Sequence, residues 1–171
     1  MNHPKSFGVW GNTDKESFWE ILPDILSWAG KKGLDAYLTT RILDHEKGST
    51  LTSKKIRSKD DMSVLDFMLV LGGDGTFLSL ARAIEHRDTP ILGIHLGDLG
   101  FLAKVTLKDL FVRLDQVANG DFIVDFRTSY QINDITKVSL IINNVLNTEY
   151  MSRPANMMPP RTIAIQCNMK I

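Results

Sequence analysis

The string Gly72-Gly73-Asp74-Gly75-Thr76 combines three glycines with one carboxylate, directly after the apolar run at residues 67–71. Glycines let a backbone approach a phosphate closely, and a helix that begins there offers unpaired N–H groups. A carboxylate beside phosphates is electrostatically unfavourable, so Asp74 indicates a chemical task. It could accept a proton from a hydroxyl that attacks a phosphoryl group, or it could hold a magnesium ion. The alternative is an aspartate that only stabilises the bend.

A second glycine string, Gly97-Asp98-Leu99-Gly100-Phe101, follows another apolar run at residues 90–95. Carboxyl ends of parallel strands meet at one edge of a sheet, so both strings are expected at the same edge. Gly97 permits a close approach, and Phe101 offers a face for a purine ring. The alternative is a turn whose Phe101 is packed into the core.

Two amides and the histidines complete the polar candidates. Asn143 and Asn144 lie in an apolar run, where buried amides need partners, either neighbouring backbone or the polar groups of a nucleotide. The four histidines lack metal-ligand spacing, so no metal site is predicted, and His95 is the one expected beside the second glycine string. Cys167, the single cysteine, is predicted to be a small core residue.

The elements that must position these residues follow from hydrophobic patterning. Predicted strands span residues 7–10, 34–38, 67–71 and 90–95, and predicted helices span residues 15–29, 77–84 and 106–119. The alternation predicts an α/β fold with an open, mainly parallel sheet flanked by helices. Thr13 or Asp14 is expected to cap the first helix, which contains Pro23.

Two stretches do not fit this alternation. Residues 41–62 are polar and basic, and a solvated, partly helical connection is favoured over a basic flap that meets substrate phosphates. After Gly120 the sequence becomes strand-rich, and alternation from Ile163 to Met169 predicts a half-buried strand. We therefore expect an α/β domain over residues 1–120. Residues 121–171 are expected to begin an all-β domain whose remainder is absent.

Composition excludes several classes of function. The 171 residues carry 20 basic and 20 acidic side chains, so broad binding to nucleic acid or to membrane surfaces is not expected. A single cysteine and the lack of an apolar segment behind the N-terminus predict a cytoplasmic protein. The chain also lacks the P-loop pattern and has no G-x-G-x-x-G after its first strand.

Both glycine strings together resemble the NAD kinase family. Phosphofructokinases and diacylglycerol-type lipid kinases carry turns similar to the first string. The second one, Gly93-Ile94-His95-Leu96-Gly97-Asp98-Leu99-Gly100-Phe101-Leu102, separates them, because lipid kinases have a different motif there. The resemblance covers about residues 5–145.

The resemblance implies transfer of the ATP γ-phosphoryl group to the 2′-hydroxyl of the adenosine ribose of NAD. It makes residues 1–120 the nucleotide-binding catalytic domain and residues 121–171 the beginning of the all-β substrate domain. Asp74 matches the general base of the family, Phe101 the aromatic residue next to adenine, and Asn143 an amide that contacts the nucleotide. Gly72, Gly73, Gly75 and Thr76 would bring backbone N–H groups to phosphate oxygens, and Gly97, Asp98 and Asn144 would complete the nucleotide-binding set. The implied partners are NAD and ATP, with polyphosphate left open as a donor, Mg²⁺ carried by ATP, and a homodimer or tetramer of the full-length protein.

The chain also departs from the family pattern. Asn144 stands where the family has an acid, Asp98 and His95 stand where it usually has Asn, and the sequence stops before the Asp-Gly and Thr-Gly-Ser segments that complete the NAD site. We therefore expect the chain by itself to lack full activity. A lipid or sugar kinase of the same superfamily, a non-catalytic nucleotide-binding remnant and an incomplete product that does not fold stably are the alternatives.

Overall fold

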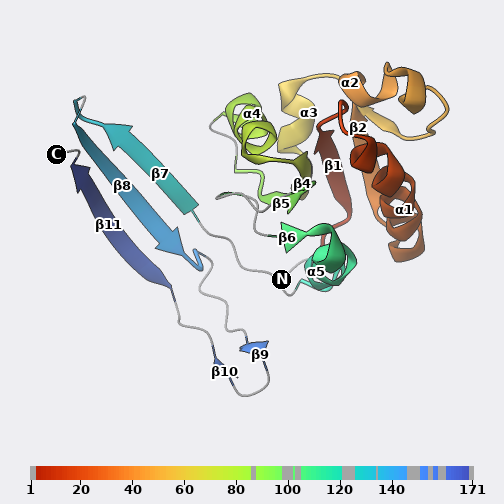
Figure 1. Cartoon of the computed structure of the whole chain (residues 1–171). Coiled ribbons are helices and arrows are strands. Elements are labelled where there is room, and N and C mark those ends of the chain that lie inside the picture. The colour runs from red at the N-terminus through yellow and green to blue at the C-terminus, as the bar shows by residue number, and fades with distance from the viewer. Residues whose placement is uncertain are drawn as a thin grey trace. The chain divides into compact units, whose positions relative to one another are not determined.

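The computed structural model describes residues 3–85, 88–97, 102, 105–120, 126–133, 135–145, 151–153, 156–157 and 161–169. The chain forms two compact units, Met1–Gly120 and Asp121–Ile171, and each is described by itself. Figure 1 labels their helices and strands.

The first unit is built on a parallel sheet. Its strands are β1 (Ser6–Gly11), β2 (Asp35–Thr39), β3 (Lys54–Ile56), β4 (Phe67–Gly72), β5 (Ile91–His95) and β6 (Val105–Thr106), in the spatial order β3-β2-β1-β4-β5-β6. Every pair of neighbouring strands is parallel. All six residues of β4 are buried, as the continuous apolar run predicts for a central strand. The predicted fold class, an open parallel sheet flanked by helices, is confirmed.

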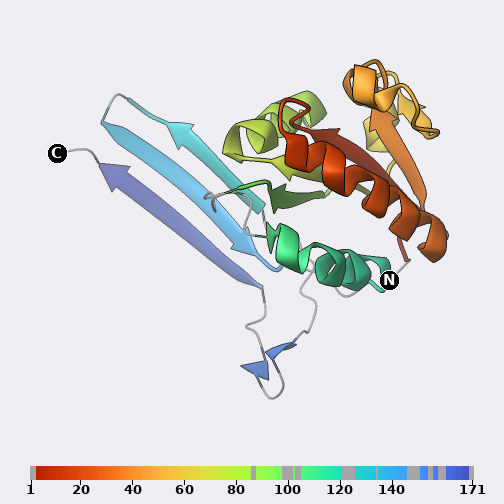
Figure 2. The ribbon, with the colours of Figure 1, turned by 45° about the vertical axis from the view of Figure 1, so that its right-hand side comes forward.

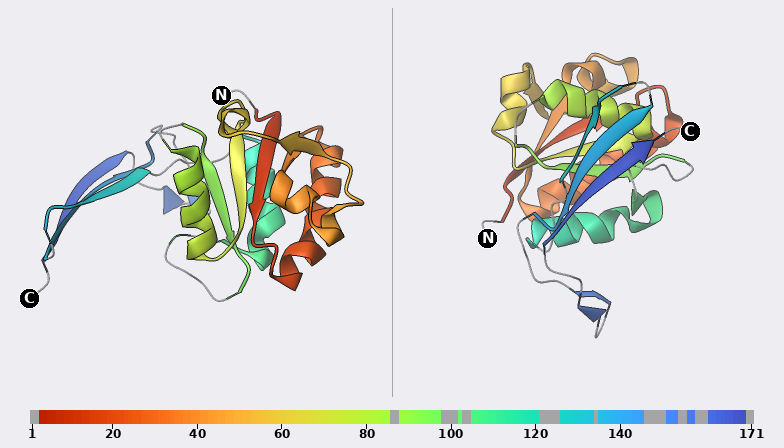
Figure 3. Two further views of the ribbon diagram at one scale, coloured as in Figure 1. Left: turned by 90° about the horizontal axis from the view of Figure 1, so that it is seen from above. Right: turned by 90° about the vertical axis from the view of Figure 1, so that its left-hand side faces the viewer.

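Helices cover both faces of this sheet (Figures 2 and 3). The helices are α1 (Glu16–Lys32), α2 (Thr40–Leu43), α3 (Lys59–Ser63), α4 (Asp74–Ile84) and α5 (Leu110–Ala118), with 3₁₀ turns at Glu46–Gly48 and Leu107–Asp109. Alternate residues of β4 serve two cores. Phe67, Leu69 and Leu71 pack with α1, α2 and α5. Met68 and Val70 pack with α3 and α4.

Helix α1 is longer than the sequence predicts. It continues through Pro23 to Lys32 and ends at Gly33, whose φ of 71° is the left-handed conformation that glycine adopts most readily. The Gly33 N–H bonds the carbonyls of Ala29 and Gly30. The expected cap is wrong: the N-cap residue is Lys15, which makes no side-chain capping bond, so Thr13 and Asp14 are available for other contacts.

Residues 41–62 also differ from the expectation, because they contribute a strand to the sheet. β3 lies at the sheet edge, between α2 and α3. Four lysines of this segment form ion pairs, Lys47 with Glu16, Lys54 with Asp35, Lys55 with Asp44 and Lys59 with Glu85. A three-residue strand that carries two lysines has no readable periodicity, although short, charged strands are typical of sheet edges. The sequence does not predict strand β6 either, because two residues are too few to show a period.

Asp115 joins α5 to α1. Its Oδ1 accepts a hydrogen bond from the indole Nε1 of Trp28 at 2.9 Å, and it forms an ion pair with Nζ of Lys32 at 2.8 Å. These contacts, with Lys32 the largest cause, hold the pKa of Asp115 below its usual value.

We expect Asp115→Asn to make the protein less stable at pH 6 but not in strong acid. Because the folded-state pKa is lowered, the ionised group contributes stability above its unfolded pKa and loses it as the pH falls through the folded value. Urea unfolding of both proteins at pH 6 and at about pH 3, below the reference pKa near 3.9, measures this. A difference in unfolding free energy that is equal at both pH values would contradict it.

The second unit is an antiparallel sheet of β7 (Phe126–Gln131), β8 (Thr136–Asn143) and β11 (Thr162–Met169), in the order β11-β8-β7. Strands β9 (Met151–Arg153) and β10 (Asn156–Met157) pair with each other. The predicted strand near residue 163 exists, but its predicted burial is wrong. Ile163 and Ile165 are 65% and 76% exposed, and Cys167 is exposed rather than a core residue. Alternation shows which side chains share a face, not whether another layer covers it, and β11 is an edge strand.

No helix among the described residues has the length and apolar character needed to cross a membrane.

Candidate functional site

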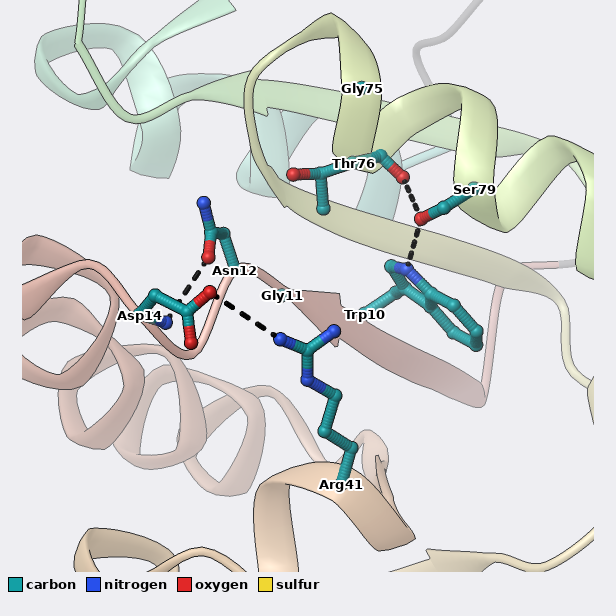
Figure 4. A pocket seen from close by; sticks show the side chains of 8 residues that line it. All are labelled: Trp10, Gly11, Asn12, Asp14, Arg41, Gly75, Thr76 and Ser79. Carbon is teal, nitrogen blue, oxygen red and sulfur yellow. Dashed lines mark hydrogen bonds and ion pairs between the residues drawn. The ribbon is translucent and has the colours of Figure 1, made fainter.

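The order of the strands locates a crevice in the first unit. Along the chain the sheet grows outward from β1 through β2 to β3, and then from β4 through β5 to β6 on the other side. The direction reverses between β1 and β4, and ligands of open α/β sheets bind outside the carboxyl ends of the strands at such a point. A cavity of about 250 Å³ lies there (Figure 4), lined by Trp10, Gly11, Asn12, Asp14, Arg41, Gly75, Thr76 and Ser79.

The first glycine string forms the junction between β4 and α4. Gly72 ends the strand, Gly73 is the N-cap with φ −97°, and Asp74, Gly75 and Thr76 form the first helical turn. The helix therefore begins at Asp74, three residues before the predicted start, because the glycines hide the helical pattern. The Gly73 carbonyl accepts the N–H groups of Thr76 at 3.0 Å and Phe77 at 3.1 Å. Gly75 lies in the same turn, where a backbone N–H can serve a ligand bound before the helix.

Gly72 and Gly75 differ in what surrounds them. A Cβ added to Gly72 would lie 2.4 Å from Oγ1 and 2.6 Å from Cβ of Thr76, so α4 approaches β4 too closely for any side chain at Gly72. A Cβ added to Gly75 would have nothing within 4 Å, and Gly75 is exposed beside the cavity. Gly72 is thus a packing residue, whereas Gly75 leaves its backbone open to a ligand.

Asp74 connects the two glycine strings. Its Oδ1 accepts a hydrogen bond from the backbone N–H of Leu102, the residue after Phe101, at 3.1 Å. Gly72 and His95 are opposite each other in the parallel pairing of β4 with β5, and the Leu96 N–H bonds the Gly72 carbonyl at 3.3 Å. The described residues of both strings therefore meet at one sheet edge, as expected.

The described part of the second string is a glycine with a positive φ. Gly97 has φ +147°, a conformation that side-chain-bearing residues rarely adopt. Lys15 Nζ donates to the Leu96 carbonyl at 2.8 Å and lies 3.3 Å from the position of a Gly97 Cβ. Lys15 therefore links the loop after β1 to the second string. Asp98 and Phe101, the other predicted binding residues of this string, lie outside the described residues.

His95, which the sequence predicts beside the second string, also lies beside the first. Its Nε2 would be 3.7 Å from a Cβ at Gly73. Its Nδ1 is buried and has no hydrogen-bond partner in the part of the chain that the structure describes.

The end of β1 and the loop after it supply residues that the sequence did not predict for the site. Trp10 Nε1 donates to Ser79 Oγ at 2.9 Å, and the Ser79 hydroxyl donates to the Thr76 carbonyl at 2.7 Å, which fixes α4 against β1. Asn12 Oδ1 accepts the Asp14 N–H at 3.1 Å. One sequence signal could have indicated this loop: it is polar and follows the first strand, just as the glycine string follows β4.

Arg41 reaches the same cavity from α2. Its Nε donates to Thr13 Oγ1 at 3.1 Å, and its guanidinium faces the Asp14 carboxylate, with Nη2 to Oδ2 at 3.7 Å. Figure 4 shows the side chain extending toward Asp14 and Trp10. Arg41 was expected in a solvated connection, and only the fold brings it to the site.

Asn143 and Asn144 lie in the second unit, at the end of β8. Asn143 is exposed, and its Nδ2 donates to Thr162 Oγ1 of β11 at 3.1 Å. Asn144 is buried at 2% exposure and has φ +53°, a left-handed conformation that asparagine tolerates better than most residues. Both residues thus have local structural roles, and their predicted contact with a nucleotide stays a prediction.

A family model now adds to this geometry. The model of the ATP-NAD kinase N-terminal domain matches residues 7–122, which include the parallel sheet apart from Ser6, the cavity and both glycine strings. The chain belongs to this family.

Known NAD kinases agree with this assignment. The NAD kinase of Thermoanaerobacter sp. (strain X514) is 34% identical over 152 residues, which are 88% of this chain and 53% of that protein. The NAD kinase of Syntrophotalea carbinolica is 35% identical over 118 residues, 69% of this chain and 40% of that protein. The chain therefore spans about half the length of the NAD kinases it matches.

A solved structure shares the fold. The crystal structure of yeast NADH kinase complexed with NADH matches with a TM-score of 0.64 at 13% sequence identity, over 96% of this chain and 47% of that one. The chain and that structure therefore share their fold.

Proposed function

We propose that the chain is the catalytic part of an NAD kinase, which transfers the γ-phosphoryl group of ATP to the 2′-hydroxyl of the adenosine ribose of NAD. The observation that carries the proposal is Asp74, a carboxylate in the first turn of α4, held by the Leu102 N–H at the reversal of strand order. Membership of the ATP-NAD kinase family supports it.

In the proposed reaction the Asp74 carboxylate accepts the proton of the 2′-hydroxyl. The resulting oxygen attacks the γ-phosphorus, a new O–P bond forms, and the bond to ADP breaks, with its electron pair leaving on ADP. Such a step depends on positioning and on stabilising charge at the phosphoryl oxygens. Backbone N–H groups at Gly73 and Gly75 are proposed to supply that stabilisation, since they lie at the start of α4, whereas the Thr76 N–H already bonds the Gly73 carbonyl.

The residues at the cavity fit a magnesium ion that arrives with ATP. The described residues contain no group of three or more His, Cys, Asp or Glu that could hold an ion. Magnesium in phosphoryl-transfer sites is typically held by one or two carboxylates together with phosphates and water. Asp14, an exposed carboxylate at the cavity, would contact it. When bound, the ion would neutralise charge on the phosphates.

The remaining assignments rest on the resemblance. Gly97, Asp98 and Phe101 are proposed to receive the adenine side of the nucleotide, and Asn143 and Asn144 its polar groups. A homo-oligomer of the full-length protein and a cytoplasmic location are proposed as well, the latter from the single cysteine.

A substrate panel tests the proposal. The full-length gene product is assayed with ATP and Mg²⁺ against NAD, NADH, diacylglycerol and fructose 6-phosphate. We expect phosphorylation of the nicotinamide nucleotides only. Phosphorylation of the lipid or the sugar in place of NAD would favour another kinase of the superfamily. Calorimetric binding of NAD and ATP without turnover would favour a non-catalytic binding protein.

A further inference from the structure

The cavity at the end of β1 has a charged rim, of which the catalytic proposal uses only Asp14. Its described lining residues include one cation, Arg41, and one anion, Asp14. Both side chains are mostly exposed, at 65% and 81%, and they face each other across the cavity (Figure 4). The first turn of α4, with Gly75 and Thr76, forms the other side.

The two contacts of Arg41 differ in quality. Nε donates to the hydroxyl of Thr13 at 3.1 Å, and Thr13 is only 5% exposed, so this bond orients the guanidinium plane on a rigid group. The contact with Asp14 is 3.7 Å between Nη2 and Oδ2, too long for a hydrogen bond. Exposed ion pairs of this kind contribute little to stability. The guanidinium is therefore oriented by Thr13 but only loosely neutralised by Asp14.

A triphosphate would be a better partner for this guanidinium than Asp14. It carries more negative charge than one carboxylate, and its oxygens match the two parallel N–H groups of arginine. An anion seated there would also approach the open backbone of Gly75 at the start of α4.

We propose that this cavity is the polyphosphate subsite of the phosphoryl donor, with Arg41 as its anion-binding residue and Asp14 as a counter-ion that the donor displaces. The inference rests on the proposed function, because it takes the donor to be a triphosphate. The displaced Asp14 stays at the rim, where the cation that accompanies ATP would meet it. Asp14 therefore weakens binding of a bare triphosphate, and Arg41 strengthens it.

Calorimetric titration of the 171-residue protein with inorganic tripolyphosphate, without a divalent cation, tests this inference. We expect Arg41→Gln to weaken binding at least about 10-fold, in the range of a lost charge-assisted hydrogen bond. Arg41→Lys should recover part of the affinity, because it keeps the charge but not the planar fork. Asp14→Asn should bind about 2- to 10-fold more tightly, since it removes a competing charge.

Arg113→Gln is the matched control, since Arg113 lies on α5 and bonds Gln116. It should bind as the unaltered protein does, and thermal unfolding of each variant verifies that it is folded. Equal affinity of Arg41→Gln and Arg113→Gln would overturn the proposal, as would weaker binding by Asp14→Asn or no binding by the unaltered protein.

Asp74→Asn separates the two proposals: it should retain tripolyphosphate binding even though NADP formation fails. If Arg41→Gln leaves tripolyphosphate binding unchanged while the protein still makes NADP, only the subsite proposal is overturned.

Discussion

Replacing Asp74 with asparagine is expected to lower NADP formation by the full-length gene product by about 10²- to 10⁴-fold, the usual contribution of a general base. Asparagine keeps the size of the side chain and an oxygen that can accept the Leu102 N–H, so the junction of the glycine strings should persist. It cannot accept a proton from the ribose hydroxyl. The turnover number and the affinities for ATP and NAD are measured for both proteins.

The expected pattern is a large fall in turnover number with both affinities changed little. Asp24→Asn, an exposed aspartate on α1, is the matched control and should leave turnover unchanged. Equal turnover in Asp74→Asn and the unaltered protein would mean that Asp74 is not the base. Loss of turnover together with loss of folding would mean that Asp74 serves the bend, the structural alternative for this residue.

Gly72→Ala and Gly75→Ala are expected to affect stability in opposite directions. At Gly72 the new Cβ would lie 2.4 Å from Thr76 Oγ1 and 2.6 Å from Thr76 Cβ, so α4 must move away from β4. Overpacking of this kind typically costs about 1–3 kcal/mol. At Gly75 the new Cβ meets nothing within 4 Å, and alanine in a helix is favoured over glycine by up to about 1 kcal/mol.

Urea unfolding of the 171-residue protein measures both effects. Because Gly75→Ala should fold normally, its affinity for tripolyphosphate reports on whether the open backbone at this position receives phosphate. We expect weaker binding, since the added methyl group stands where a ligand would approach. Equal losses of unfolding free energy in the two variants would contradict the different roles assigned to Gly72 and Gly75.

The fold could be predicted where a segment is long and its burial is uniform. The apolar run that became β4 is buried on both faces, and the stripe of α1 packs on one core, so both patterns were strong. The edge strand β3 has three residues and two lysines, which carry no period. The burial of Ile165 could not be predicted either, because it depends on what covers the face rather than on the alternation of β11.

The candidate site could be predicted only where local sequence makes it. The turn around Asp74 is local, and the residue types of its glycines and carboxylate by themselves indicate phosphate chemistry. Arg41, by contrast, reaches the cavity because β2 lies beside β1 and its side chain bonds Thr13. Lys15 likewise approaches Gly97 only through the packing of the loop after β1 against the carboxyl edge of β5. Such contacts depend on the order of the strands in the sheet, which the local sequence pattern does not specify.

Phosphorus NMR of the reaction products tests the central claim most directly. The full-length gene product is incubated with NAD, ATP and Mg²⁺, in parallel with its Asp74→Asn variant. We predict that the unaltered protein produces ADP together with the 2′-phosphomonoester resonance of NADP, and that the variant produces neither above background. ADP formation with no 2′-phosphomonoester, or equal NADP formation by both proteins, would contradict the assignment of Asp74 as the base that directs the γ-phosphoryl group to the ribose of NAD.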